Sequence, residues 1–166
     1  AEARGLANIR FERGSLLDIG KLGLGPFDYI DCCGVLHHLA DPQAGLDALV
    51  SVLTPDGGLG VMVYGELGRI GVYHLQEMLR TVAPPGEDDR TRVAMARRLV
   101  AALPPTAWLN RNGLVRDHKE GGDPGIYDLF LHARDRAYTV PEVAGLVDAA
   151  GLQLTAFIEP YRYEPA

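Results

Sequence analysis

Two apolar segments on either side of a predicted helix, within residues 27–64, restrict the fold of this chain more than any other feature. Apolar or β-compatible residues with little alternation, typical of a strand covered on both faces of a parallel sheet, occur at Tyr29, Ile30, Cys32, Cys33 and Val35. Residues 59–64 form a second apolar run. Strands joined through a helix pair in parallel with a right-handed crossover, so this stretch predicts a doubly wound α/β sheet.

The segment between the two strands has its own start and stop signals. Asp41 can cap a helix whose first position is Pro42, where a missing N–H costs nothing. Apolar residues then recur at helical spacing and predict a stripe that faces the sheet: Leu46, Leu49, Val50 and Leu53. The sequence Thr-Pro-Asp-Gly-Gly at 54–58 is expected to end the helix. Ligands of such sheets bind at the carboxyl ends of strands, here residues 33–38 and 64–69.

The composition indicates one globular protein and argues against a dedicated nucleic-acid surface. The 166 residues carry a net charge of −6 with no basic cluster. No apolar run is long enough to span a membrane, and no secretory signal opens the chain. Cys32 and Cys33 are adjacent, so a disulfide between them would be strained. We expect two buried thiols in a reducing compartment, which predicts a cytoplasmic protein.

The rest of the chain predicts an α/β core that is interrupted in sequence by an inserted segment. Alternating apolar residues predict strands at 8–13 and 152–158, and helical spacing predicts helices at 72–82 and 88–103. Residues 108–125 show no period and predict a loop that acts as a lid.

The last helix has clear limits. Thr139 and Glu142 form a capping box at its start, and Gly151 is placed to end it. We therefore expect an α/β core at 1–64 and 139–159, with a mainly helical or loop cap inserted at 65–138.

Residues 27–64 resemble class I S-adenosylmethionine-dependent methyltransferases. The resemblance rests on four pieces: Phe27-Asp28-Tyr29-Ile30, Gly34-Val35-Leu36-His37-His38-Leu39, Asp41-Pro42 and Leu53-Thr54-Pro55-Asp56-Gly57-Gly58. In that family these are the fourth strand, the loop after it, the fourth helix and the turn into the fifth strand. The resemblance implies a partial Rossmann-like doubly wound sheet of the methyltransferase type, with S-adenosyl-L-methionine as cofactor.

The family's glycine-rich first loop and its ribose-binding acid have no counterpart in these residues. We therefore expect a central fragment of a longer methyltransferase, in which unpaired sheet edges allow self-association.

The resemblance also implies roles for residues at strand ends. The expected cofactor-binding residues are Ser15, Leu16, Cys33, Gly34, Val35 and His38. The backbone of Cys33 and Gly34 would meet the methionine part, and Val35 would flank the sulfonium. Ser15 and Leu16, in a segment that resembles the loop after the third strand, would line the adenine.

Histidine and charged residues supply the candidates for chemistry. His38 would either orient its loop, the role we favour, or act as a base, and His37 is expected to be exposed. Tyr64 is the second catalytic candidate or a plain rim aromatic. A larger set would either meet in a substrate pocket or form solvated ion pairs: Arg69, Asp128, His132, Arg134 and Asp135. The solvated alternative is favoured for Asp135, and no spacing suggests a metal site.

The sequence therefore predicts methyl transfer from S-adenosyl-L-methionine to an unidentified small-molecule or protein acceptor, with Tyr64, Arg69 and His132 binding the acceptor. The alternative is a non-catalytic interaction module on a degenerate methyltransferase scaffold. A nicotinamide enzyme is disfavoured, because the turn at 54–58 has no role in hydride transfer.

Overall fold

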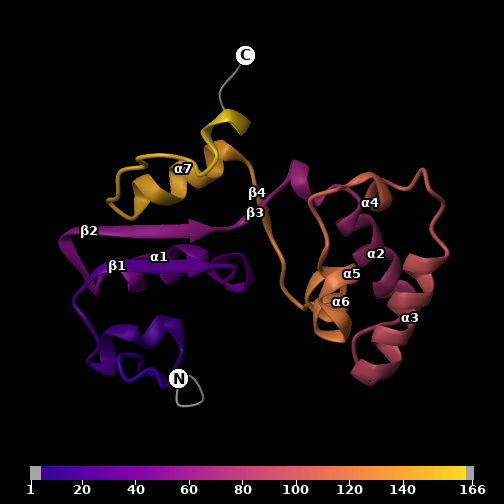
Figure 1. The fold of residues 1–166 in the computed structure, drawn as a ribbon, viewed down its shortest axis with the longest axis horizontal. Helices are drawn as coiled ribbons and strands as arrows, with labels where there is room; N and C mark the ends of the chain where they lie inside the picture. Colours follow the sequence, from indigo (N-terminus) through magenta and orange to yellow (C-terminus); the bar gives the residue numbers. More distant parts are fainter. Residues whose placement is uncertain (1–4, 164–166) are drawn as a thin grey trace.

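The structure is a computed structural model that describes residues 5–163. It is a mixed α/β fold in which a strand-containing part and a helical part are joined by two short strands (Figure 1). No helix among the described residues is long and apolar enough to cross a membrane.

The first part is a strand, helix, strand unit. β1 (Phe27–Cys33) and β2 (Leu53–Met62) pair in parallel, and α1 (Pro42–Val50) connects them. The side chain of Asp41 accepts a hydrogen bond from the Ala44 N–H, as its predicted capping role requires. Two 3-10 helices complete the unit, η2 (Leu16–Leu22) before β1 and η3 (Leu36–His38) after it.

The helix in this unit ends earlier than the sequence predicted. α1 stops at Val50, so Leu53 belongs to β2 rather than to the helical stripe. Phe27 lies opposite Leu53 and Tyr29 opposite Gly58, so the register shifts between these pairs. The predicted turn at 54–58 is therefore a bulge inside β2.

A second, shorter pair of strands connects the two parts. β3 (Tyr64–Gly65) pairs in parallel with β4 (Ala137–Tyr138). α7 (Val140–Ala149) follows β4, and the predicted capping box is present, because Thr139 and Glu142 bond each other's backbone N–H. Gly151 follows the helix with φ 71°, in the left-handed region that ends many helices.

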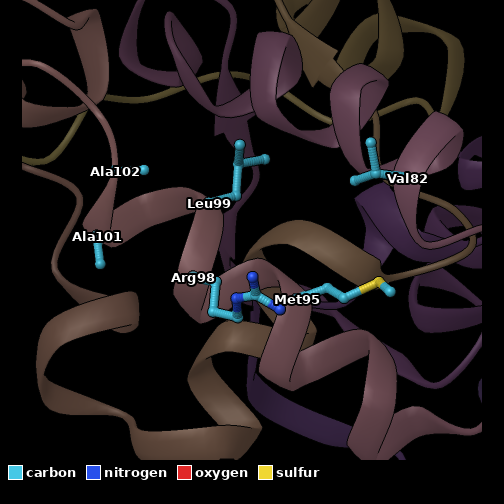
Figure 2. A pocket seen from close by; sticks show the side chains of 6 residues that line it. All are labelled: Val82, Met95, Arg98, Leu99, Ala101 and Ala102. Carbon is cyan, nitrogen blue, oxygen red and sulfur yellow. The ribbon is translucent and has the colours of Figure 1, made fainter.

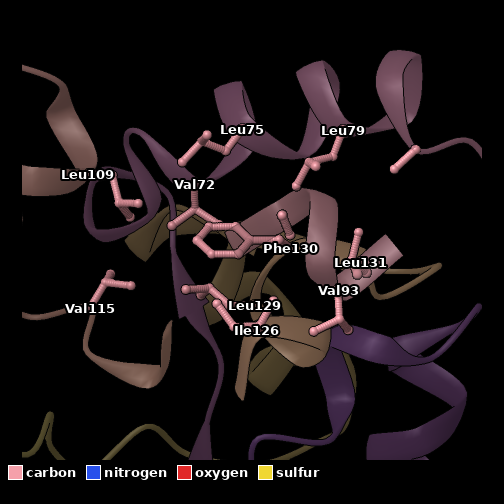
Figure 3. Close-up of a cluster of buried hydrophobic side chains, with 12 residues drawn as sticks. Val72, Leu75, Leu79, Val93, Leu109, Val115, Ile126, Leu129, Phe130 and Leu131 are labelled. Carbon is pink, nitrogen blue, oxygen red and sulfur yellow. The ribbon is translucent and has the colours of Figure 1, made fainter. Parts of the chain in front are cut away.

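The helical part lies between β3 and β4 in sequence. Its elements are η4 (Leu67–Arg69), α2 (Val72–Val82), α3 (Asp89–Ala101), α4 (Trp108–Arg111), α5 (Asp117–Glu120) and α6 (Gly122–Leu131). Twelve buried residues form its core, the helical cluster: Val72, Leu75, Leu79, Ala83, Val93, Ala96, Leu109, Val115, Ile126, Leu129, Phe130 and Leu131. Figure 3 shows the Phe130 ring at the centre of this cluster.

A smaller core lies in the strand part. Its buried members, here called the sheet cluster, are Cys32, Leu36, Leu46 and Leu49. Leu146 and Ala150 of the α7 region pack against it, so α7 covers the unit that α1 also covers.

Several predictions about this architecture are wrong. Residues 8–13 and 152–158 are not strands, because no strand of the described chain lies beside them to accept their hydrogen bonds. Residues 108–125 are not a loop lid: they contain α4, α5 and the start of α6, and Leu109 and Val115 join the helical cluster. Residues 5–163 hold two two-stranded sheets, which do not confirm a doubly wound sheet.

The sheet is also less covered than predicted. Tyr29 in β1 is 63% exposed, because β2 is the only strand paired with β1 in the described chain. Cys32 is buried as expected, whereas Cys33 is exposed, since adjacent side chains of a strand point to opposite faces.

Candidate functional site

The site begins in the loop after β1. Gly34 has φ 76°, a conformation that favours glycine, and its N–H donates to the Met62 carbonyl at 3.1 Å. The fully buried Leu36 then anchors η3 in the sheet cluster. This anchor places His37 and His38 at the carboxyl end of β1, where the fold type predicts a ligand.

His37 is buried rather than exposed, which corrects the sequence prediction. It is 1% exposed, and its ring lies 3.7 Å from the ring of Tyr64, centroid to centroid. The Arg69 guanidinium lies 3.6 Å from the centroid of the same Tyr64 ring. Burial, reinforced by the nearby His38, lowers the pKa of His37 to about 4, so the ring is neutral at pH 7. Burial likewise raises the pKa of Tyr64.

Arg69 and Asp135 form a buried ion pair, so the solvated alternative is wrong for both. Their side chains are 5% and 1% exposed, and Arg69 Nη2 lies 2.6 Å from Asp135 Oδ2. Gln76 Nε2 donates to Oδ2 at 2.8 Å, and the Tyr73 hydroxyl donates to Oδ1 at 3.3 Å. Burial, with the adjacent carboxylate, raises the pKa of Tyr73 to about 12. These hydrogen bonds offset the cost of desolvating the pair.

His38, Asp128 and His132 form a second group, here called the His-Asp-His cluster. The rings of His38 and His132 lie 3.9 Å apart, and His38 Nε2 lies 3.9 Å from Asp128 Oδ1. His38 Nδ1 lies 2.7 Å from the Arg134 carbonyl, an acceptor to which it can donate. The Tyr64 hydroxyl donates to Asp128 Oδ2 at 3.5 Å. Tyr64 therefore links the buried ion pair to the cluster.

The acceptor-binding candidates Tyr64, Arg69 and His132 thus lie together, and His38 lies with them. β3 supplies Tyr64, η4 supplies Arg69, and His132 follows α6 directly. The site is built where the strand part meets the helical part. The roles assigned to these residues from sequence stay predictions.

Comparison with known proteins bears on what this arrangement does. Residues 1–59 match the family model described as "Methyltransferase domain". The first third of the chain is thus similar to a methyltransferase domain. This confirms the resemblance drawn from the sequence, and the match includes β1, η3 and α1.

A relative from Synechococcus sp., named "Uncharacterized protein syc1184_c", is 35% identical over 159 residues. The match covers 95% of this chain and 38% of the relative, so the chain spans well under half of that protein's length.

All the predicted cofactor-binding residues lie within residues 1–59, which match the family model. Gly34 and Val35 follow β1 directly, and Val35 is 39% exposed. The Cys33 thiol donates to Asp31 Oδ1 at 2.8 Å, which raises its pKa. Leu16 packs against the sheet cluster, and Ser15 precedes η2. Their cofactor contacts stay predictions.

Sequence reasoning missed Gln76 and Tyr73, which hold Asp135. Gln76 carried a usable signal, because it is a polar residue beside the apolar stripe of α2 and is 2% exposed. A buried polar side chain requires a partner, and Gln76 Nε2 also donates to the Leu129 carbonyl at 3.0 Å.

An apolar hollow on the helical part contains no residue of this site. Figure 2 shows its lining, contributed by the end of α2 and by the second half of α3 with the residue after it: Val82, Met95, Arg98, Leu99, Ala101 and Ala102.

Proposed function

We propose that the protein containing this chain transfers a methyl group from S-adenosyl-L-methionine to a small-molecule or protein acceptor. The methyltransferase match over residues 1–59 supports the reaction class. The observation that carries the proposal is the position of His38 and Tyr64 at strand ends, against polar residues of the helical part. In this proposal residues 65–138 form a cap that selects the acceptor.

Methyl transfer from a sulfonium is an in-line displacement that needs close approach more than acid–base chemistry. The acceptor attacks the methyl carbon, and the sulfonium leaves as a neutral thioether. Most of the rate enhancement therefore comes from holding donor and acceptor together and excluding water. The chain supplies positioning groups, because the Tyr64 ring contacts both the buried His37 ring and the buried Arg69 guanidinium.

His38 suits an orienting role in this reaction. Its contact with the Arg134 carbonyl ties the loop after β1 to the segment that follows α6. The N–H of Arg136 also donates to the His37 carbonyl at 3.2 Å. Two bonds from one segment thus fix the loop that includes the proposed cofactor residues Gly34 and Val35.

Calorimetric titration of the intact protein with S-adenosyl-L-methionine and its demethylated product tests the proposal. We expect saturable binding and a rise in melting temperature, because a ligand that binds only the folded state stabilises it. Absence of both heat and thermal shift at saturating ligand would contradict the proposed function.

A pair of glycine variants tests the position of the cofactor. Gly34→Ala should weaken cofactor binding at least about tenfold, because an added Cβ disfavours the φ of 76° on which the loop depends. Gly23→Ala is the matched control: Gly23 has φ 65° with no atom within 4 Å of an added Cβ, and it precedes the opposite end of β1. Equal affinities in the two variants would place the cofactor elsewhere.

A further inference from the structure

We propose that the His-Asp-His cluster is a binding site for one divalent transition-metal ion. His38, Asp128 and His132 each offer one ligand atom, and these atoms all lie within 4.8 Å of one another. The three residues come from η3, from α6 and from the position after α6. His38 is far from the other two residues in sequence, so ligand spacing along the chain did not indicate the three-residue site.

The donor set matches the chemistry of such ions. Two imidazole nitrogens and one carboxylate oxygen are ligands that Zn²⁺ and its neighbours in the first transition row share. Ligand atoms around tetrahedral zinc lie about 3.4 Å apart. His38 Nε2 and Asp128 Oδ1, at 3.9 Å, are close to that separation already. The side chain of Asp128 is 52% exposed, which leaves room for the small adjustment that this separation requires.

Surrounding groups hold the ligands in a suitable orientation. The Arg134 carbonyl lies against Nδ1 of His38, which leaves Nε2 of that ring for the ion. Nδ1 of His132 lies against both the carbonyl and the N–H of Arg134, so the same residue holds the second ring in place. The Tyr64 hydroxyl donates to Asp128 Oδ2 and leaves Oδ1 facing His38. Partners of this kind fix ring orientation and tautomer in metal sites.

The charge and openness of the cluster also suit a cation. The nearby Arg69 pairs with Asp135 rather than with Asp128, so the Asp128 carboxylate is available to the ion. Three protein ligands at a partly exposed position leave a fourth position open, as in zinc sites that bind substrate. If the proposed methyl transfer is correct, that position faces the acceptor and suits a hydroxyl or thiol group. Metal binding itself does not depend on that function.

Cobalt titration of the intact, chelator-treated protein tests the site without any S-adenosyl-L-methionine. Co²⁺ in such a site gives visible d–d absorption, so we expect a saturable band at one equivalent that Zn²⁺ displaces. Loss of an outer-sphere partner alone weakens metal sites by about 10–100-fold. His132→Ala and Asp128→Asn should therefore each weaken cobalt binding at least about tenfold.

Two further variants separate ligand loss from misfolding. Asp128→His replaces one ligand with another and should retain one equivalent of cobalt with a shifted spectrum. His74→Ala removes an exposed histidine of α2 outside the cluster and should bind as the wild type does. The proposal is overturned if the wild type shows no saturable band, or if His132→Ala retains full affinity. Either result leaves the calorimetric test of methyl transfer unaffected.

Discussion

The helical cluster and the sheet cluster differ in how completely their residues bury one another. Twelve residues are buried in the helical cluster and four in the sheet cluster. Val61 and Met62 at the end of β2 stay 38% and 43% exposed. The helical part thus forms a core from its own residues. The strand part, which contains the residues that match the methyltransferase domain, carries the proposed cofactor loop on strands whose side chains are partly exposed. The buried polar residues of the site, His37, Arg69 and Asp135, lie where the strand part meets the helical part.

The largest expected effect is loss of the central aromatic ring of the helical part. Phe130→Ala should lower the free energy of unfolding by about 3–5 kcal/mol, because Phe130 is 3% exposed and its loss leaves a cavity. Urea denaturation measures the change. Tyr29→Ala, at an exposed position of β1, should stay within about 0.5 kcal/mol. If both variants lost a similar free energy of unfolding, the difference in burial between the helical part and the strand part would have no effect on stability.

The ion pair at the boundary should come next. Asp135→Asn removes the charge that compensates buried Arg69 and should cost about 2–3 kcal/mol. Asp123→Asn is the matched control, because its Arg97 partner is exposed and such pairs contribute about 0–1 kcal/mol. The same denaturation assay compares them. A neutral Asp135→Asn variant would mean that the boundary contributes little stability.

A smaller effect is expected at the start of α7. Thr139→Ala removes the side chain that accepts from the Glu142 N–H and should cost about 1 kcal/mol. Thermal unfolding followed by circular dichroism measures it. Thr81→Ala, at an exposed position of α2, should show no such loss. If both variants melt together, the capping box does not stabilise α7.

The smallest effect concerns pH. Burial lowers the pKa of His118, so the unfolded chain takes up this proton first as pH falls. Neutral His118 therefore makes its full contribution to the free energy of unfolding above about pH 6.5, and that contribution declines below this pH. His118→Phe should flatten the slope of unfolding free energy between pH 7 and 5 by less than about 1.4 kcal/mol per pH unit.

His74→Phe is the control for that slope, because His74 is an exposed histidine of α2. His37 contributes in the same direction in every variant, since its pKa is also lowered. A slope that His118→Phe leaves unchanged would contradict the assignment.

Local signals were the predictable part of the fold. Asp41 and Thr139 cap helices as expected, because a cap depends on side chains within three or four residues. Residues 108–125 were mistaken for a loop, since helices of four residues are too short to show a period. Their buried residues, such as Leu109, are held by tertiary packing, which periodicity does not report. The alternation at 8–13 failed for a similar reason, because a strand requires a partner.

Some residues of the candidate site could be singled out from the sequence, whereas their surroundings could not. The motif and strand ends singled out His38 and Tyr64 because loops at carboxyl ends of strands carry function. Nothing local shows that Asp135 is buried, or that the ring of His37 packs against Tyr64. Those features depend on how α2 and α6 pack, and a single sequence carries little information about such packing.

The pairing of β3 with β4 has a consequence for how such a protein diversifies. Tyr64 lies opposite Ala137 and Gly65 opposite Tyr138, so residues 66–136 leave at the carboxyl end of β3 and return at the amino end of its hydrogen-bonded neighbour β4. A segment anchored by neighbouring strands can be exchanged for one of another length while the strands keep their register. Under the proposed function, an exchange of this segment would change acceptor preference and leave the pairing of β3 with β4 in place.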